Sequence, residues 1–153
     1  MLNYAGYFKR FIAGLIDYFI IWAFQKTIGI LIAPRFLQKG LATLPTEALT
    51  QSYYEMINAW IGLAYQLIIG IIPLVLFAYL ISNKGYSPGK KLLGLAIQKK
   101  NGGNLSFGKA IVRELGKIIS IIPLGLGFIW IFFDKKRQAW HDKFAGSVVV
   151  SSK

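Results

Sequence analysis

The sequence contains no cysteine and a single histidine among its 153 residues. The lack of cysteine excludes disulfide frameworks, thiolate nucleophiles, thiolate-bound zinc and iron–sulfur clusters, and one histidine excludes any site that needs two imidazoles. Acidic residues are also scarce, at six against eighteen lysines and arginines, so the formal net charge is +12. We therefore expect no metal and no cofactor, and we expect an anionic partner, either nucleic acid or lipid.

Charged residues make up only 16% of the chain, whereas hydrophobic residues make up 55%. This composition excludes a disordered chain, and the length favours one domain covering residues 1–153. The apolar residues gather in long runs, so anionic headgroups beside a membrane explain the positive charge more simply than nucleic acid does. We expect the partner to be a lipid bilayer, and we expect no binding to nucleic acid.

Two apolar runs are long enough to cross a bilayer, because a transmembrane helix needs about twenty residues. Residues 11–33 are apolar apart from Asp17 and the polar cluster Gln25–Thr27, and residues 57–81 contain no charged side chain. The first run also resembles a signal peptide, but Asp17 interrupts it and no cleavage site of small residues follows. We expect both runs to be membrane spans and the first to be a retained anchor.

A third apolar run, residues 118–133, is short for a crossing and has helix-breaking residues at its centre. It predicts a re-entrant or interfacial hairpin folded at Pro123–Gly127, with a third span as the alternative. Cytoplasmic loops collect lysine and arginine. The loop 82–117 and the tail 134–153 both have an excess of these residues, which favours the hairpin and places the N-terminus, the loop and the tail in the cytoplasm.

Short β-elements are predicted in the basic loop and the tail. Residues 92–98 are typical of a strand, Asn101–Gly103 of a hairpin turn and residues 104–107 of its antiparallel return. Val148–Val150 is a candidate third strand. The expected fold is therefore membrane α-helical, with two transmembrane helices, a re-entrant, interfacial or third hydrophobic segment, and a small cytoplasmic β-element.

Several lysines of the loop are expected to contact lipid headgroups. Residues 107–117 carry apolar and basic side chains on separate sides, a pattern typical of a basic helix lying on anionic lipid. The stretch Gly85–Lys91 departs from the spacing of a phosphate-binding loop and instead predicts a proline-fixed turn with two lysines on lipid phosphates. The expected headgroup contacts are Lys90, Lys91, Lys109 and Lys117.

Three segments, Tyr4–Asp17, Gly85–Gly94 and Phe133–Gly146, together resemble the RDD family of small bacterial and archaeal membrane proteins, named for an arginine and two aspartates. The resemblance carries the arginine onto Arg10 and the first aspartate onto Asp17. It carries the second aspartate onto Asp142, with Asp134 as the alternative. It implies a multi-pass protein of the cytoplasmic membrane, for which ligand transport or cation/proton exchange has been proposed, and it names no substrate.

Asp17 is the main candidate for a functional residue, because a carboxylate near the centre of a membrane helix costs about 2.5–3.5 kcal/mol and usually has a task. Arg10 lies on the same helical face about 10.5 Å away along the axis. Its side chain leans away from Asp17, so we expect it to reach a lipid phosphate. Two interpretations of Asp17 stay open: it binds a proton or cation, or it pins helices together by bonding Gln66 or a loop cation such as Arg113.

The tail offers further candidates for a cytoplasmic latch, namely Asp134 and His141 together with Arg113. Asp142 is expected to cap a helix or pair with a basic residue, and His141 to contact the carbonyls that close the hairpin. An unperturbed histidine also titrates near cytoplasmic pH, which makes a pH-sensing latch an option. No serine or cysteine nucleophile accompanies the His141–Asp142 pair, so we do not expect an enzyme.

Two functions are compatible with these features. The first is an oligomeric transporter or cation/proton exchanger in which Asp17 binds the ion, Gln66 lines the facing helix, and Arg10 and Asp142 gate the cytoplasmic side. The second is a non-transport subunit that binds lipid or a membrane protein partner through its basic cytoplasmic face. The first requires a homo-oligomer, because two spans and a hairpin enclose little volume.

Overall fold

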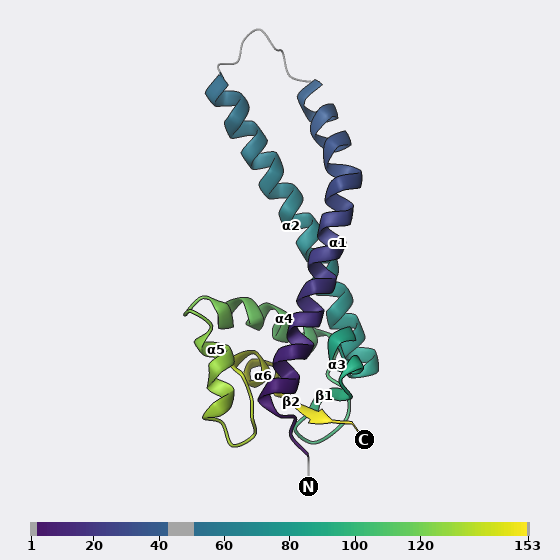
Figure 1. Cartoon of the computed structure of the whole chain (residues 1–153), viewed down its shortest axis with the longest axis vertical. Helices are drawn as coiled ribbons and strands as arrows, with labels where there is room; N and C mark the ends of the chain where they lie inside the picture. Colours follow the sequence, from purple (N-terminus) through teal and green to yellow (C-terminus); the bar gives the residue numbers. More distant parts are fainter. Residues whose placement is uncertain (1–2, 43–50, 153) are drawn as a thin grey trace. The chain divides into compact units, whose positions relative to one another are not determined.

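A computed structural model describes residues 3–42 and 51–152. The chain divides into two compact units, one formed by Met1–Phe19 together with Leu74–Lys153 and the other by Ile20–Pro73. Both long helices contribute to both units (Figure 1). The first unit contains all the short helices and both strands, so it carries most of the residues singled out from the sequence.

The long helices are α1, Tyr7–Ala42, and α2, Gln51–Lys84. Tyr7–Leu31 and Glu55–Lys84 are long and apolar enough to cross a membrane, as expected of the first two runs. The helices continue well beyond those runs, so the loop expected between residues 33 and 57 is helical at residues 34–42 and 51–56; residues 43–50 lie outside the described part. An apolar run ends where burial in lipid becomes costly, but leucine, alanine, glutamine and lysine still favour helix in water.

The second unit consists of the adjoining halves of α1 and α2. The hydroxyl of Tyr65 would lie 3.8 Å from a Cβ placed on Gly29, so the two helical segments touch there. Large apolar side chains such as Ile30, Trp60 and Leu67 are exposed on them. Helices that expose apolar residues in this way are typical of proteins surrounded by lipid.

A two-stranded antiparallel sheet joins distant parts of the first unit. β1, Leu95–Lys99, pairs with β2, Ser147–Ser151, with Ile97 opposite Val149. The N-terminal segment bonds the other edge of β2 through the amide of Ala5 and the carbonyl oxygen of Val149. The prediction of strands near both ends of this region is confirmed, but their expected pairing is wrong.

The expected partner of the first strand, residues 104–107, is not a strand. The amide of Lys99 does donate to the carbonyl oxygen of Gly103, so the chain turns there as predicted. Leu105 then enters the core and Phe107 begins α4, which leaves no extended segment to return beside β1. The run Val148–Val150 has the higher β-propensity and fills the place instead.

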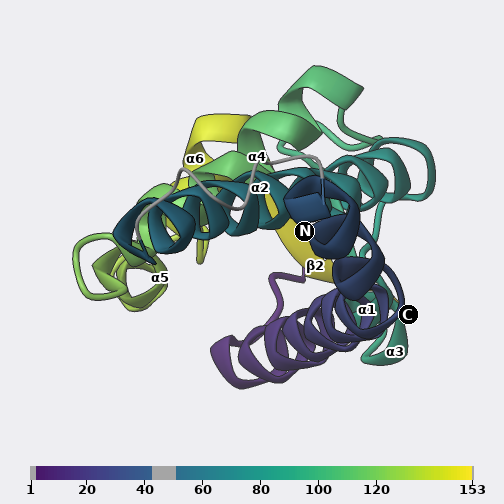
Figure 2. The same ribbon diagram turned by 90° about the horizontal axis from the view of Figure 1, so that it is seen from above.

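The short helices are α3, Pro88–Leu92; α4, Phe107–Ile121; α5, Leu126–Ile129; η1, Trp130–Phe132; and α6, Trp140–Ala145. α4 and α6 lie side by side (Figures 1 and 2). A Cβ on Gly116 of α4 would lie 3.1 Å from the Cα of His141 in α6, so glycine permits this close packing. The core beside them is made of Ala5, Ala13, Ala78, Ile81, Leu95, Ile97, Leu105, Ala110, Ala145 and Val149.

The third apolar run is broken where the sequence predicts. α4 and the α5–η1 segment form an angle of 114°. Leu124 and Gly125 have φ angles of 53° and 79°, a left-handed conformation that ends the helix. A Cβ on Gly127 would lie 2.6 Å from the Cα of Ser120, so the chain folds back tightly onto the end of α4.

Candidate functional site

Asp17 lies in the first unit, on α1, and only 4% of its surface is exposed. Its Oδ2 accepts a hydrogen bond of 2.6 Å from the hydroxyl of Ser87 and lies 3.4 Å from Nζ of Lys90. Its Oδ1 accepts a bond of 2.7 Å from the amide of Gly89. We name Asp17, Ser87, Gly89 and Lys90 the Asp17 cluster, in which one carboxylate has three donors.

The Ser-Pro-Gly-Lys stretch is suited to build this cluster. Pro88 begins α3, because its fixed φ suits the first turn of a helix. Gly89 allows the backbone to approach α1, since a Cβ there would overlap the carbonyl oxygen of Ala13 and lie 3.0 Å from Asp17 Oδ1. Ser87 precedes the helix but turns its hydroxyl to Asp17 rather than capping α3. The predicted turn is thus a docking element for the carboxylate.

Lys90 does not contact lipid headgroups as expected, because its side chain is buried against Asp17. Burial lowers the pKa of Lys90 to about 8, and the nearby positive charges of Arg113 and Lys117 lower it further, while Asp17 and Glu114 oppose the shift. The ammonium is therefore readily deprotonated for a lysine. The burial follows from the Asp17 carboxylate, which supplies the anion that lipid phosphate was expected to supply.

The other expected headgroup lysines differ among themselves. Lys91 and Lys109 are exposed, and Nζ of Lys91 lies 5.2 Å from the ring centre of Tyr86. Lys117 instead forms a 2.6 Å ion pair with Glu114. Only Lys91 and Lys109 of the four therefore keep an exposed position.

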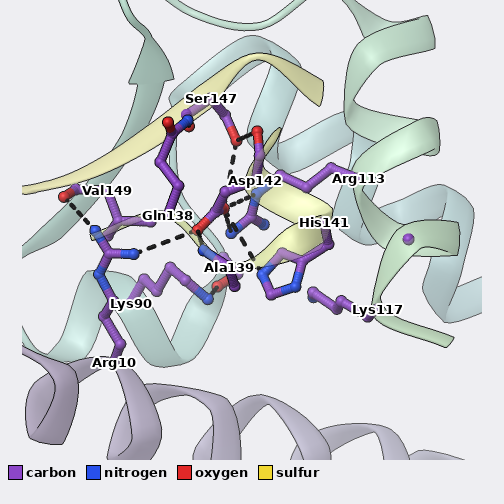
Figure 3. A network of polar contacts seen from close by, with 12 residues as sticks. Arg10, Lys90, Arg113, Lys117, Gln138, Ala139, His141, Asp142, Ser147 and Val149 are labelled. Atoms are coloured by element: carbon purple, nitrogen blue, oxygen red, sulfur yellow. Dashed lines mark hydrogen bonds and ion pairs between the residues drawn. The ribbon is translucent and has the colours of Figure 1, made fainter. Parts of the chain in front are cut away.

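A second buried carboxylate, Asp142 of α6, lies at the centre of a larger network (Figure 3). Nε and Nη2 of Arg113 each lie 3.0 Å from its Oδ1, and Nη1 of Arg10 lies 3.3 Å from its Oδ2. The hydroxyl of Ser147 and the amide of Ala139 donate to it as well, each at 3.3 Å. We name these five residues the Asp142 cluster; it joins α1, α4, α6 and β2.

Burial would raise the pKa of Asp142, but Arg113 and Arg10 outweigh that effect and hold it well below the ordinary value. The carboxylate therefore stays ionised at any physiological pH. Both sequence expectations for Asp142 describe its contacts, since it caps α6 through Ala139 and pairs with basic residues.

Arg10 does not extend to a lipid phosphate. Its guanidinium leans away from Asp17, as expected, but meets protein acceptors: the carbonyl oxygens of Arg137 at 2.6 Å and Val149 at 2.8 Å, besides Asp142. The cause is the N-terminal segment, which runs along β2 and brings the start of α1 against the C-terminal part of the chain. Arg10 and Asp17 therefore belong to different clusters.

His141 lies beside the Asp142 cluster, with Nε2 3.7 Å from Oδ1 of Asp142 and Nδ1 3.5 Å from Oγ of Ser120. Its ring also packs on Phe128, so it contacts residues on both sides of the break rather than the carbonyls that close it. Burial lowers the pKa of His141 to about 3, helped by Arg113, Lys117 and Lys90 and opposed by Asp142. The ring is neutral near neutral pH, which argues against the pH-sensing latch.

Asp134 occupies an exposed turn. Its carboxylate pairs with Lys143 at 2.8 Å and accepts the amides of Lys136 and Gln138, each at 3.0 Å. Gln66 is exposed on α2 in the second unit, whereas the donors to Asp17 given above all belong to the first. Neither residue therefore joins the two clusters.

Sequence reasoning missed Ser87, Glu114 and Gln138. Glu114 is buried between Arg113, 3.4 Å away, and Lys117, and the amide of Gln138 donates to the carbonyl oxygen of Ser147 at 2.6 Å. Glu114 gave a signal, as the lone acid in a strongly basic loop, and Ser87 stands within the motif that carries the family resemblance. Gln138 gave none.

Two helices suited to crossing a bilayer, joined to a buried network of paired charges, define a helical membrane protein. Residues 4–146 match the RDD family, and the chain belongs to that family. This confirms the resemblance found in three segments of the sequence.

The relatives in curated collections support a membrane location without naming an activity. The uncharacterized protein YxaI of Bacillus subtilis is 32% identical over 149 residues, 95% of this chain and 96% of its own. The uncharacterized membrane protein YteJ of the same organism is 29% identical over 152 residues, 98% of this chain and 82% of its own. A proline-rich antigen of Mycobacterium leprae is 29% identical over 131 residues, 80% of this chain and 51% of its own. No solved structure matches.

Proposed function

We propose that the protein exchanges a small monovalent cation for a proton across the cytoplasmic membrane, with Asp17 as the cation-binding carboxylate and Lys90 as its tethered competitor. The carrying observation is the buried pair between them, at 3.4 Å, on a helix suited to span a bilayer. An ionisable residue at such a place is a functional candidate by default.

The arrangement offers Asp17 two alternative counter-charges. With Lys90 protonated, its ammonium neutralises the carboxylate. When Lys90 releases its proton, the hydroxyl of Ser87 and the amide of Gly89 still orient Asp17, but the positive charge is lost. A sodium or potassium ion would then restore neutrality, because an unpaired buried carboxylate is costly. One proton leaves as one cation enters, so the exchange is electroneutral.

The surroundings of the pair favour release of the proton from the lysine. Arg113 and Lys117 lie near enough to lower the pKa of Lys90, which burial brings to about 8. The Asp142 cluster, in contrast, has two arginines on one carboxylate and lacks a readily deprotonated partner. We therefore assign ion exchange to Asp17 and a holding role at the cytoplasmic end of α1 to Arg10 and Asp142.

The proposal includes an orientation and an assembly. The basic loop and both termini lie in the cytoplasm, in keeping with their excess of lysine and arginine. The part of the chain that the structure describes contains two helices that could cross as continuous spans, too few to enclose a path for an ion. The exchanger is therefore a homo-oligomer.

Proton movement in proteoliposomes that contain a pH dye tests the exchange. Pulses of Na⁺, K⁺ or Li⁺ should drive proton efflux through the intact protein, and Asp17→Asn should abolish it. Asp134→Asn is the matched control, because it removes a carboxylate from an exposed turn outside both clusters. Equal flux through the intact protein and Asp17→Asn, with both monodisperse and helical, would exclude Asp17 as the ion-binding group.

A second candidate is a non-transport assembly or interaction subunit. The observation in its favour is that each buried carboxylate already has cationic partners within the chain, as expected of a purely structural network. In this case no cation would drive a proton flux. A stoichiometric membrane protein should also co-purify at native expression, and its absence would count against this function.

A further inference from the structure

The faces of α4 are reversed relative to a helix on the surface of a soluble protein. Its buried side includes Arg113, Glu114 and Ser120, whereas Val112 and Ile119 are exposed. A soluble helix turns its apolar stripe to the core and its charges to water. The expectation that α4 would lay its basic side on headgroups is therefore wrong, because Arg113 and Lys117 are held inside by Asp142 and Glu114. The large apolar residues exposed on and just after α4 are Phe107, Val112, Leu115, Ile118, Ile119, Ile121 and Ile122.

The exposed apolar surface continues past the break. Leu124, at the turn, has 95% of its surface exposed, and Phe133, just after η1, has 76% exposed. Leu126, Ile129, Trp130 and Phe132 are exposed between them. We name residues 107–133 the elbow. An exposed apolar surface of this extent marks contact with a membrane or another protein.

Two observations indicate lipid as the covering partner. The ring of Phe132 lies 4.3 Å from that of Tyr7, the first residue of α1, so the surface of the elbow meets the start of a candidate span whose Phe8 and Phe11 are also exposed. Cationic residues then follow at once. Lys135 and Lys136 are exposed, and Nζ of Lys143 lies 5.3 Å from the ring centre of Trp130. Tryptophan and lysine together are typical of the boundary between acyl chains and anionic headgroups.

We infer that the elbow is embedded in one leaflet, the cytoplasmic one, with its exposed apolar face among the acyl chains and Lys135, Lys136 and Lys143 at the headgroups. The polar side of α4 is satisfied within the protein, which a segment at membrane depth requires. The bend of 114° lets the chain enter and leave the same leaflet. This arrangement does not depend on whether the protein exchanges ions.

Single cysteines can test the inference cleanly, because the natural chain has none. Val112→Cys, Leu115→Cys and Ile119→Cys would each carry a nitroxide in vesicles of phosphatidylethanolamine and phosphatidylglycerol. Oxygen concentrates among acyl chains, whereas a charge-neutral nickel chelate stays in water. We expect a severalfold higher ratio of oxygen to nickel collisions at these three positions than at Lys136→Cys, the control at the rim.

Two results would overturn the inference. Nickel collisions as frequent at the three positions as at Lys136→Cys would place the face in water. Low collision rates with both reagents, accompanied by spin–spin broadening, would show that a second copy of the chain covers it.

Sidedness provides a separate check. A membrane-impermeant maleimide should label Lys109→Cys and Lys136→Cys from the same side of sealed vesicles. Labelling of the two from opposite sides would show that the elbow crosses the bilayer and would contradict a one-leaflet location. Loss of cation-driven flux in Asp17→Asn has no bearing on either result, so failure of the elbow inference and failure of the exchange proposal are distinguishable.

Discussion

The amide of Gly89 donates to Oδ1 of Asp17 over 2.7 Å, which joins α3 directly to α1. The two residues come from separate segments of the family motif, and their contact gives a physical reason for both. The carboxylate needs donors in an apolar setting, and a turn without a side chain can bring a backbone amide close enough. Serine and lysine on either side of Gly89 then complete the coordination of the same carboxylate.

We predict that Gly89→Ala disrupts the Asp17 cluster. The new Cβ would overlap the carbonyl oxygen of Ala13, so α3 must move away from α1 and lose the bond to Asp17. Gly108→Ala is the matched control, because nothing lies within 4 Å of a Cβ there and alanine favours helix. Thermal unfolding in detergent should show a lower midpoint for Gly89→Ala and an unchanged or higher one for Gly108→Ala. Equal midpoints would show that the contact between α3 and α1 is looser than described.

We also predict that Asp142→Asn is strongly destabilising. Neutralising this carboxylate leaves the buried charges of Arg113 and Arg10 without their anion, and breaking a buried pair in this way costs about 3–5 kcal/mol. Asp134→Asn removes a partly exposed pair with Lys143, a change worth about 1 kcal/mol or less. Equilibrium unfolding in a mixed-detergent titration measures both. A similar loss from the two variants would contradict the central place of Asp142.

The sequence predicted the elements better than their partners. Hydrophobic length located both long helices, and Pro123–Gly127 located the break, because these signals are local. The pairing of β1 with β2 was missed since it joins segments far apart in the chain, and the nearer residues 104–107 also had a strand pattern. Local propensity does not rank one partner above another.

The same limit applies to the charged residues. Arg10 and Asp17 were singled out by type and position, but the partners expected for Arg10 and Lys90 were lipid phosphates, whereas both side chains meet protein. A basic side chain beside a membrane has two kinds of anion available to it. Only the tertiary fold decides between them, here by bringing Asp142 to Arg10 and Asp17 to Lys90.

We predict that His141 makes the protein less stable in mild acid. The folded protein has a His141 pKa of about 3, against 6.5 for an ordinary histidine. The contribution of the neutral ring is therefore present above pH 6.5 and lost as the pH falls from 6.5 toward 3, since only the unfolded chain takes up the proton there. The charged groups around it, Asp142, Arg113, Lys117 and Lys90, keep their charges over most of this window. His141→Asn should flatten the fall in unfolding free energy between pH 6.5 and 4.5, and an unchanged slope would assign it to other groups.

Exchange should rise with pH through the range in which Lys90 loses its proton. The pKa of Lys90 is lowered to about 8, so Asp17 is freed for an external cation mainly above that pH and is held by the ammonium below it. Proteoliposome flux should therefore be low at pH 7 and high at pH 9. Lys90→Arg should remove the rise and leave flux low throughout, because arginine stays charged in this range. Lys91→Arg, at the exposed neighbour, should keep the rise. A rise retained in Lys90→Arg would assign the pH dependence to a different group and remove Lys90 as the competitor.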